Sequence, residues 1–153
     1  MIIVIQRVSH ASVEINNSIV GKIERGLVLF LGVVKGDTEK DVVYLANKVV
    51  ALRMFPDSEG KMNLSINDID GSMLIISQFT LAAECRKGNR PSFDKAEQPG
   101  KAEALYNLFV SKMRETTPHT ATGRFGADMI VSLANDGPVT FVINSKQAAG
   151  GDQ

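Results

Sequence analysis

The sequence predicts a single α+β domain in which a mostly antiparallel, barrel-like β-sheet packs against two principal helices. Three observations predict this fold class. They are apolar alternation near the N-terminus, two segments with the apolar spacing of amphipathic helices, and a length of 153 residues, which suits one domain. The predicted element order is ββαβαββ. We assign residues 1–145 to this domain and residues 146–153 to a frayed C-terminal tail.

The first two strands are predicted to form a hairpin. Residues 2–15 alternate between apolar and polar side chains, and the Asn-Asn pair at 16–17 tolerates the left-handed backbone of a two-residue turn. Residues 18–34 form the second strand, which Gly26 interrupts with a turn or bulge. The end of this strand, residues 27–34, is nearly continuously apolar, as is typical of a strand buried on both faces.

A helix is predicted to begin after Thr38, which suits the N-cap position. Acidic residues in its first turn stabilise the helix by interacting with its dipole. Its apolar positions share one face: Val42, Leu45, Ala46, Val49 and Val50. Residues 53–70 are polar and contain Pro and Gly, so we expect a long loop there. Loops of this length in a compact domain are often functional.

The second half is predicted to contain a buried strand at 72–81, a polar loop at 83–95 and a helix from Pro99 to about Thr116. An apolar stripe supports this helix: Ala102, Leu105, Tyr106, Phe109 and Met113. Two strands, at 127–135 and 139–145, are then expected to close the fold as a hairpin.

Composition restricts the function. The net charge of zero excludes a general positive field as the means of holding nucleic acid, although a local patch of Lys and Arg is enough to bind phosphate. The apolar start at residues 1–5 is too short for a signal peptide, and no apolar run reaches membrane-spanning length. We therefore expect a soluble cytoplasmic protein with no membrane partner.

The usual catalytic side chains are scarce. Cys85 is the one cysteine, so an internal disulfide is impossible, and a lone cysteine in a loop is usually incidental. His10 and His119 are too few for a His-rich metal site, and we expect no metal or cofactor. A serine hydrolase usually needs a nucleophile beside a histidine, and no Gly-x-Ser-x-Gly motif is present. Both histidines are interpreted as ordinary surface residues.

Two segments carry candidate chemistry. In SQFTL at residues 77–81, a buried strand suddenly acquires polar side chains. These side chains either satisfy local backbone groups where the strand ends or line a pocket together with exposed N–H groups. NDGPVT at residues 135–140 is either a tight hairpin turn and nothing more, or a Gly-Pro turn with a cis bond and a function.

Together, SQFTL and NDGPVT resemble the two signature motifs of the D-aminoacyl-tRNA deacylases, the D-tyrosyl-tRNA deacylase family. The resemblance covers nearly the whole chain and includes the opening MIIVIQRV, the loop KGNRPSF at 87–93 and TGRFGADM at 122–129. Each motif alone is moderately specific, whereas all of them in this order and at this length are highly specific.

The resemblance implies an enzyme that hydrolyses the carboxylic ester between a D-amino acid and the 3′-terminal adenosine of tRNA, in translation quality control. Glycine on tRNA is also expected to fit. The implied partners are tRNA and a second copy of the chain, in an obligate-type homodimer with its active site at the interface. The implied catalytic residues are Ser77, Gln78, Phe79 and Thr80.

Chiral selection is expected to come from Gly137 and Pro138, by analogy a cis pair that reaches from one subunit into the pocket of the other. L- and D-amino acids carry the same groups, so affinity for a side chain does not separate them. If the backbone carbonyls of this turn hold the α-amino group, an L side chain collides with the turn and a D side chain points to open space. Glycine has no side chain to exclude.

For the chemistry, Thr80 is the obvious nucleophile, but the sequence offers no clear base to activate it. We favour assistance from the vicinal 2′-hydroxyl of the terminal adenosine. The protein then supplies orientation and backbone N–H groups near Phe79 and Thr80 for the oxyanion, with Ser77 and Gln78 as supporting hydrogen-bond partners.

Further residues have two interpretations each. Phe79 or Phe125 either stacks on the terminal adenine or packs in the core. A basic set either binds the tRNA acceptor stem or is a solvated loop: Arg86, Lys87 and Arg90. Arg7 either anchors the 137–138 turn or points to solvent, and Asn135 is assigned a supporting place in that turn.

Two other functions stay open: an editing deacylase of the same fold with relaxed chirality, and a non-catalytic dimeric module that binds RNA ends.

Overall fold

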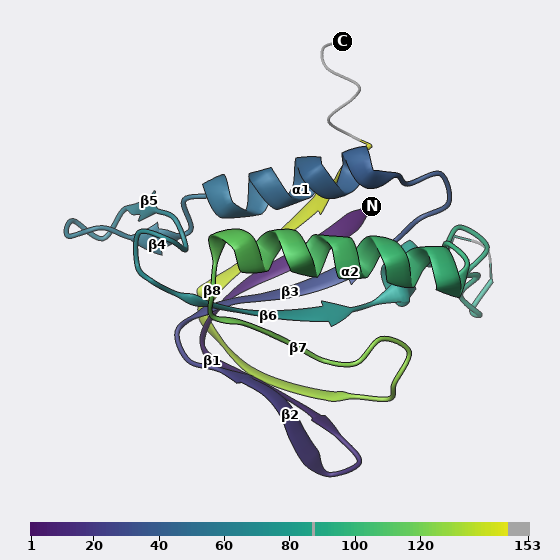
Figure 1. Cartoon of the computed structure of the whole chain (residues 1–153), viewed down its shortest axis with the longest axis horizontal. Helices are drawn as coiled ribbons and strands as arrows, with labels where there is room; N and C mark the ends of the chain where they lie inside the picture. The colour runs from purple at the N-terminus through teal and green to yellow at the C-terminus, as the bar shows by residue number, and fades with distance from the viewer. Residues whose placement is uncertain (87, 147–153) are drawn as a thin grey trace.

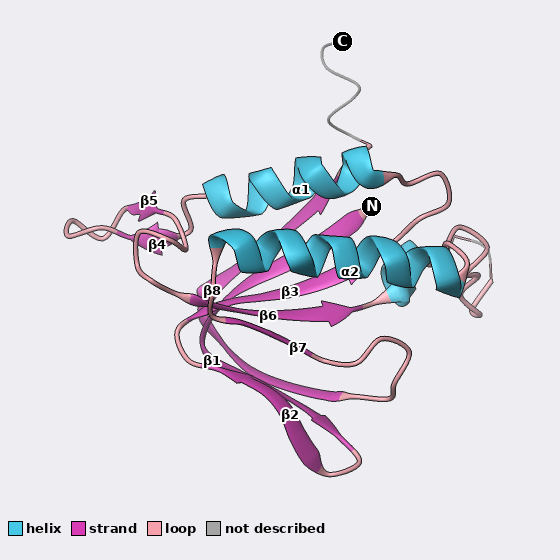
Figure 2. Cartoon of the chain, viewed as in Figure 1, coloured by secondary structure: helices cyan, strands magenta, loops and turns pink. Residues whose placement is uncertain are grey.

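The structure is a computed structural model that describes residues 1–86 and 88–146; Lys87 and most of the predicted tail lie outside the described residues. Two helices lie side by side over one face of a twisted sheet (Figure 1), and the lower strands curl away beneath them (Figure 2). The elements, in chain order, are β1 (Ile2–Ile15), β2 (Ser18–Ile23), β3 (Gly26–Gly32), α1 (Glu39–Ala51), β4 (Phe55–Pro56), β5 (Met62–Leu64), β6 (Ser72–Ser77), the 3-10 helix η1 (Phe79–Ala82), α2 (Pro99–Thr116), β7 (Thr120–Thr122) and β8 (Ile130–Asn144).

β1 organises the sheet because it is long enough to pair with three strands. Along one edge its first half pairs antiparallel with β3 and its second half with β2, while β8 pairs along the other edge. The predicted hairpin turn is confirmed, since Asn16 and Asn17 have φ of 51° and 61°. Gly26 begins β3 where a Cβ would stand 1.8 Å from the Ser72 carbonyl oxygen, so no larger residue fits.

The sheet is mixed: the three pairings of β1 are antiparallel, in line with the predicted mostly antiparallel sheet, but two parallel pairings were not predicted. β3 pairs with β6, and β6 with β7, in parallel. The reason is connectivity: α1 lies between β3 and β6, and α2 between β6 and β7, and such crossovers return the chain to the start of the next strand. The sequence did not predict β7 because Thr-Ala-Thr is too short to show a pattern. The small β4–β5 pair was likewise hidden in the predicted 53–70 loop.

The predicted hairpin at 127–135 and 139–145 does not form. Residues 130–144 are one strand, β8, and both of its halves pair with β1: Val131 with Val13, and Val142 with Val4. The Asp-Gly-Pro segment projects from this strand as a bulge, with register shifts on either side of Val8. Pairing with the long strand β1 therefore takes the place of the local hairpin that the Asp-Gly turn signal predicted.

Both predicted helices are present. Asp41 accepts hydrogen bonds from the N–H and hydroxyl of Thr38 (2.9 and 3.1 Å), which caps α1, and Pro99 opens α2. Their apolar faces pack on fully buried strand residues such as Ile3, Ile5 and Leu29. Neither helix combines the length and hydropathy needed to cross a membrane.

The opposite face of the sheet closes over a smaller core, formed by Val8, Ala11, Val13, Ile23, Val28, Leu74 and Ile76. At Gly21 a Cβ would stand 2.9 Å from the carbonyl oxygen of Thr122, so glycine allows β2 to approach β7 closely. This approach makes the sheet nearly closed, in agreement with the barrel-like prediction.

Candidate active site

A cavity of about 510 Å³, here called the first cavity, opens where β6 ends. The predicted strand at 72–81 stops at Ser77, and the chain turns into η1. This change of direction places three of the four predicted catalytic residues, Ser77, Gln78 and Phe79, in the cavity lining, while Thr80 is exposed beside them in η1.

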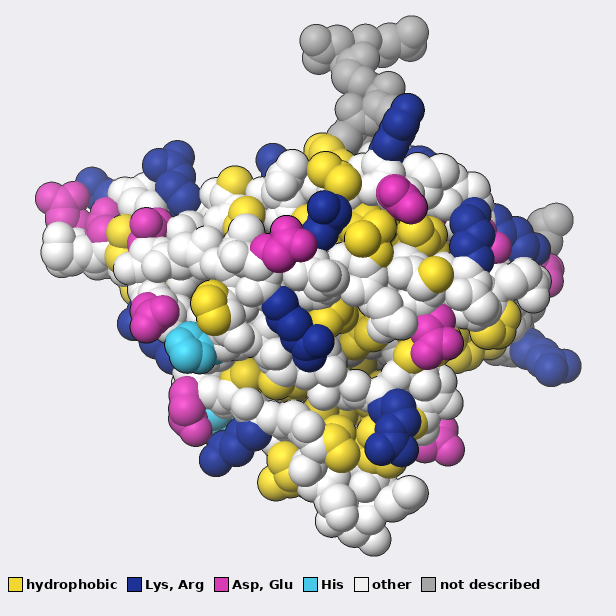
Figure 3. All heavy atoms as spheres, viewed as in Figure 1, with side chains coloured by type: hydrophobic (Ala, Val, Ile, Leu, Met, Phe, Trp, Pro, Cys, Tyr) yellow, Lys and Arg dark blue, Asp and Glu magenta, His cyan; other side chains and the backbone are white. Residues whose placement is uncertain are grey.

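The wall of the first cavity is largely apolar and aromatic. Ala102 and Tyr106 come from α2, and Phe125 and Met129 come from the segment before β8. The Tyr106 hydroxyl donates to the Ile75 carbonyl (2.9 Å), and burial raises its pKa to about 12, so it stays neutral at physiological pH. Figure 3 shows hydrophobic side chains exposed below α2, among basic and acidic side chains that are interspersed.

The rim of the first cavity provides hydrogen-bond donors, and among the described residues no acidic or histidine side chain forms a hydrogen bond with the Thr80 hydroxyl. The side-chain amide of Gln78 donates to the Thr80 hydroxyl. An amide N–H does not take up a proton, so this contact positions the hydroxyl without activating it. The N–H groups of Phe79 and Thr80 open η1, where a helix leaves its first donors unpaired by its own backbone.

Two acidic residues of the lining were not predicted from sequence. Glu97 and Asp128 both line the first cavity. Lys101 donates to Glu97 (2.8 Å) and holds the pKa of its carboxyl below the usual range. Asp128 lies in TGRFGADM, so that motif was the available signal; Glu97 carried none, since acidic residues before a helix are common.

The Gly137–Pro138 turn projects from the middle of β8, and its peptide bond is cis, as the resemblance implied. The Asn135 side chain spans the base of the turn, accepting from the Val139 N–H (2.7 Å) and donating to the Val139 carbonyl (3.3 Å). Arg7 is 9% exposed and donates from Nε to the Asp136 carbonyl (2.9 Å) and from Nη1 to the Met54 carbonyl (2.7 Å). Arg7 therefore anchors the turn and does not point to solvent.

A single chain does not bring the two motifs together. Gln78 lies level with Leu31, whose carbonyl accepts its N–H, and the 137–138 turn lies level with Arg7, which pairs with Leu27. Four residues of strand separate Leu31 from Leu27, which corresponds to about 13 Å. Both Gly137 and Pro138 are exposed and therefore accessible to another molecule.

Other predicted residues lie outside the first cavity. Arg86 and Arg90 are exposed in the loop that follows η1, and Lys87 lies outside the described residues. Neither His10 nor His119 lines the cavity. Within residues 1–86 and 88–146, no group of three His, Cys, Asp or Glu side chains is arranged to hold a metal ion.

Comparison with known proteins shows strong similarity over almost the entire chain. The model of the D-Tyr-tRNA(Tyr) deacylase family matches residues 4–144. The D-aminoacyl-tRNA deacylase of Geobacter metallireducens is 56% identical over 148 residues, covering 97% of this chain and 98% of that protein. The D-aminoacyl-tRNA deacylase of Thermosipho melanesiensis is 53% identical over 145 residues, covering 94% and 97%.

Two solved structures have the same fold. The c-Myc DNA unwinding element binding protein aligns with a TM-score of 0.89 and 38% identity, covering 94% of this chain and 98% of that chain. A probable eukaryotic D-amino acid tRNA deacylase aligns with a TM-score of 0.83 over 93% and 97% of the two chains. Because the sequence identity is 15%, this second match shows only that the two folds are alike.

Proposed function

The chain belongs to the D-Tyr-tRNA(Tyr) deacylase family, and we propose that it hydrolyses the ester bond of D-aminoacyl-tRNA as a step of translation quality control in the cytoplasm. The products are free tRNA and the D-amino acid. The observation that carries this proposal is the first cavity, which places Ser77, Gln78 and Phe79 beside an aromatic wall. Its volume of about 510 Å³ lies in the range of small-molecule sites and suits an aminoacylated nucleoside.

In this proposal the terminal adenosine enters the first cavity against Phe125 and Tyr106, whose ring centroids are 5.8 Å apart. The ester carbonyl lies at the rim near η1, where the N–H groups of Phe79 and Thr80 stabilise the developing oxyanion. The adjacent 2′-hydroxyl of the RNA assists the attack of water, because Thr80 faces an amide donor rather than a base.

The active site is proposed to form between two copies of the chain. The separation of the 137–138 turn from Gln78 within one chain requires a second copy to supply the turn. Val4 on β1 pairs with Phe30 on β3 and with Val142 on β8, so these three side chains form a row on the sheet face opposite the helices. None of the three is fully buried. Val142 is 69% exposed, and a symmetric partner would cover this row.

Chirality is proposed to be selected by steric exclusion at the partner's turn. With the α-amino group held by the backbone carbonyls of Gly137 and Pro138, an L side chain meets the turn, whereas a D side chain does not. Glycyl-tRNA escapes exclusion because glycine has no side chain. Arg7 and Asn135 support this role by fixing the turn through its backbone on both sides.

The direct test is hydrolysis of D- and L-tyrosyl-tRNA prepared on the same tRNA. We expect release of D-tyrosine and retention of L-tyrosine on tRNA. Equal hydrolysis of both would favour an editing deacylase with relaxed chirality.

Mixing two inactive variants tests whether the site is shared between subunits. Ala127→Phe fills the first cavity, and Gly137→Leu blocks the turn. If each site combines one cavity with the partner's turn, random reassociation restores about a quarter of the parent activity, because half of the dimers are mixed and each mixed dimer has one intact site. Restoration of no activity by verified mixed dimers would contradict a shared site.

A second candidate function is a nucleic-acid-binding module without catalysis. The likeness to the c-Myc DNA unwinding element binding protein favours it, since that protein is named for binding rather than hydrolysis. Binding of uncharged tRNA with no turnover of either tyrosyl-tRNA would support this function over the deacylase.

A further inference from the structure

A second cavity of about 540 Å³ lies on the other side of η1 from the first. The two cavities share a thin wall: Phe79 lines the first and Leu81 the second, and Ala96 lines the first and Lys95 the second. A bridge between Val34 and Ala96 completes this wall. A ligand chain leaving the first cavity across η1 would therefore enter the second.

The second cavity concentrates positive charge in a protein of zero net charge. Four cationic side chains line it: Lys35, Arg86, Lys95 and Lys146. Two acidic side chains are among the described lining residues, Asp37 and Glu84. Asp37 is fully buried and pairs with the α-amino group of Met1 (2.6 Å) and with Lys146 (3.6 Å), and Lys146 also pairs with Asp41 (3.0 Å). The lining thus has a surplus of cationic side chains.

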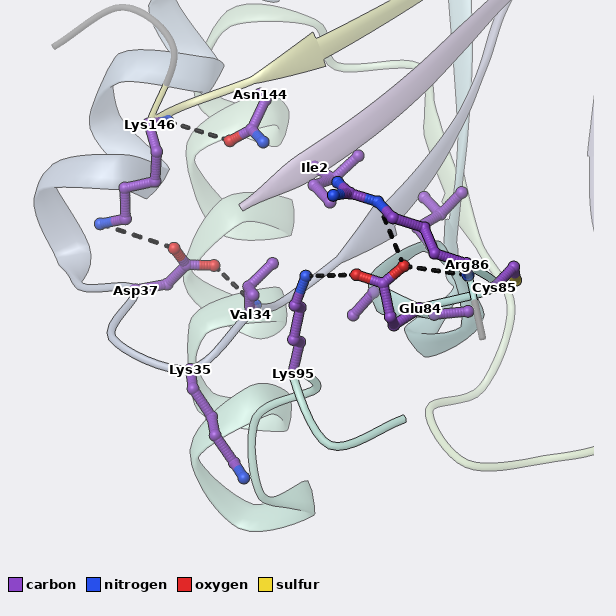
Figure 4. Close-up of a pocket in the computed structure, with 13 residues that line it drawn as sticks. Ile2, Val34, Lys35, Asp37, Glu84, Cys85, Arg86, Lys95, Asn144 and Lys146 are labelled. Atoms are coloured by element: carbon purple, nitrogen blue, oxygen red, sulfur yellow. Dashed lines mark hydrogen bonds and ion pairs between the residues drawn. The ribbon is translucent and has the colours of Figure 1, made fainter. Parts of the chain in front are cut away.

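Figure 4 shows how these groups are held. Glu84 lies between Lys95 Nζ (2.8 Å) and Arg86 Nε (3.4 Å), so one carboxylate orients two cations. Lys35 is exposed and forms no ion pair with any described residue. In Figure 4 the Lys35 side chain points away from the Glu84 pair. Two cations held by Glu84, with a further cation in the same lining that has no ion pair, form a suitable receptor for an extended anionic ligand such as a phosphodiester strand.

We propose that this second cavity binds a phosphodiester group of the nucleotides that precede the terminal adenosine of tRNA. The inference rests on the proposed function, because it assumes that the adenosine occupies the first cavity. Each backbone phosphate carries a negative charge, and the strand must leave the first cavity past one of its walls. The η1 wall leads to the surplus of cations, so Lys35 and Lys95 would fix the strand while the ester is hydrolysed elsewhere.

The test compares a substrate with phosphates and one without. The Lys35→Ala/Lys95→Ala double variant is assayed with D-tyrosyl-tRNA and with D-tyrosyl-adenosine, which lacks any phosphate. Both lysines are exposed, so the fold should be retained. We expect KM for D-tyrosyl-tRNA to rise about tenfold with kcat unchanged, no change for D-tyrosyl-adenosine, and a salt dependence of KM shallower by about one to two in the log–log slope.

Lys61→Ala is the matched control. Lys61 is 70% exposed and pairs with Glu59 (3.1 Å), much as Lys95 pairs with Glu84, but it lies beside the β4–β5 pair. This control should leave both substrates unaffected. An equal rise in KM for both substrates in the double variant, or no rise in KM for D-tyrosyl-tRNA, would overturn the inference. In either case, hydrolysis of D-tyrosyl-tRNA by the parent would still support the proposed function.

A binding assay separates this inference from failure of the proposed function. Fluorescence anisotropy with an uncharged RNA oligonucleotide ending in CCA needs no catalysis. Weaker binding by the double variant than by the parent and Lys61→Ala supports the phosphate site even if the parent hydrolyses nothing. Unchanged binding by the double variant would refute it.

Discussion

At the residue scale, the Thr80 hydroxyl illustrates how contacts decide a role that residue type leaves open. A hydroxyl at a strand end suggests a nucleophile, and the sequence alone could only note that no base was evident. The structure adds a specific partner, the amide of Gln78, which donates to the hydroxyl. A donor at this position does not remove the proton that a nucleophile must lose.

Thr80→Ala should therefore retain appreciable turnover of D-aminoacyl-tRNA, with a loss of no more than about tenfold in kcat, because orientation and backbone donors remain. Single-turnover hydrolysis measures this directly. As the companion experiment, a 2′-deoxy terminal adenosine should reduce the rate far more in the parent enzyme. Trapping of an acyl ester on Thr80 would show that our assignment of the attacking group is wrong.

At the element scale, β8 is the part of the fold where local sequence signals misled. Asp136-Gly137 is a hairpin signal, yet the segment interrupts a continuous strand. Arg7 on β1 and Asn135 on β8 hold the base of the bulge, so the turn is positioned by two strands rather than by a loop. A turn mounted in this way is suited to act as a rigid steric element.

Gly137→Ala should weaken discrimination between D- and L-substrates. Gly137 has φ of +140°, and a Cβ there would stand 2.7 Å from Val139 Cγ2 and 3.1 Å from Arg7 Nη2, so the turn must shift. We expect kcat/KM for D-tyrosyl-tRNA to fall about tenfold or more and the ratio of D to L rates to fall with it.

Gly60→Ala provides the control for backbone strain alone. Gly60 also has a positive φ, of +78°, but a Cβ there would have no neighbour within 4 Å. This variant should lose some stability and keep its D to L ratio. If the two variants change the ratio equally, the turn is not the selective element.

At the scale of the whole molecule, a buried polar network joins the first strand, the first helix and the end of the last strand. The Met1 α-amino group donates to Asp37 (2.6 Å) and to the Ser145 hydroxyl (2.9 Å), which in turn donates to Asp41 (2.7 Å). Lys146 reaches Asp41 from outside (3.0 Å). The network fixes β1 and β8 side by side, and the turn and the apolar row both depend on that pairing.

Asp41→Asn should destabilise the fold in a pH-dependent way. Burial opposes the charge of Asp41, but hydrogen bonds from Ser145, Lys146 and Thr38 outweigh it and hold the pKa below the usual range. A lowered folded-state pKa adds stability above the unfolded-state value, and this stability is lost as the pH falls. Urea unfolding should show a loss of about 1–3 kcal/mol at pH 7, and this loss should shrink below about pH 4. A difference independent of pH would mean that the charge of Asp41 contributes nothing.

Patterns confined to neighbouring residues were predicted from sequence and are present in the structure. The Asn16–Asn17 turn, the Thr38 cap and the Pro99 helix start each depend on a few adjacent residues, and each is found where expected. Pairings between distant segments were not predictable in the same way. The parallel β3–β6 pair and the β1–β8 pair depend on which strand lies alongside, and local periodicity contains no such information.

By itself, the sequence determined that this is a two-helix α+β domain and, through SQFTL and NDGPVT, that it belongs with the deacylases. The sequence could determine these two points because helix and strand patterns depend on neighbouring residues, and because a family motif is compared residue by residue. Only the tertiary structure decided that 77–79 line a cavity with an aromatic wall, that Arg7 holds the 137–138 turn, and that the two motifs lie apart in one chain. The physical reason is that a cavity and a separation are properties of packed segments far apart in sequence, which no spacing along the chain records.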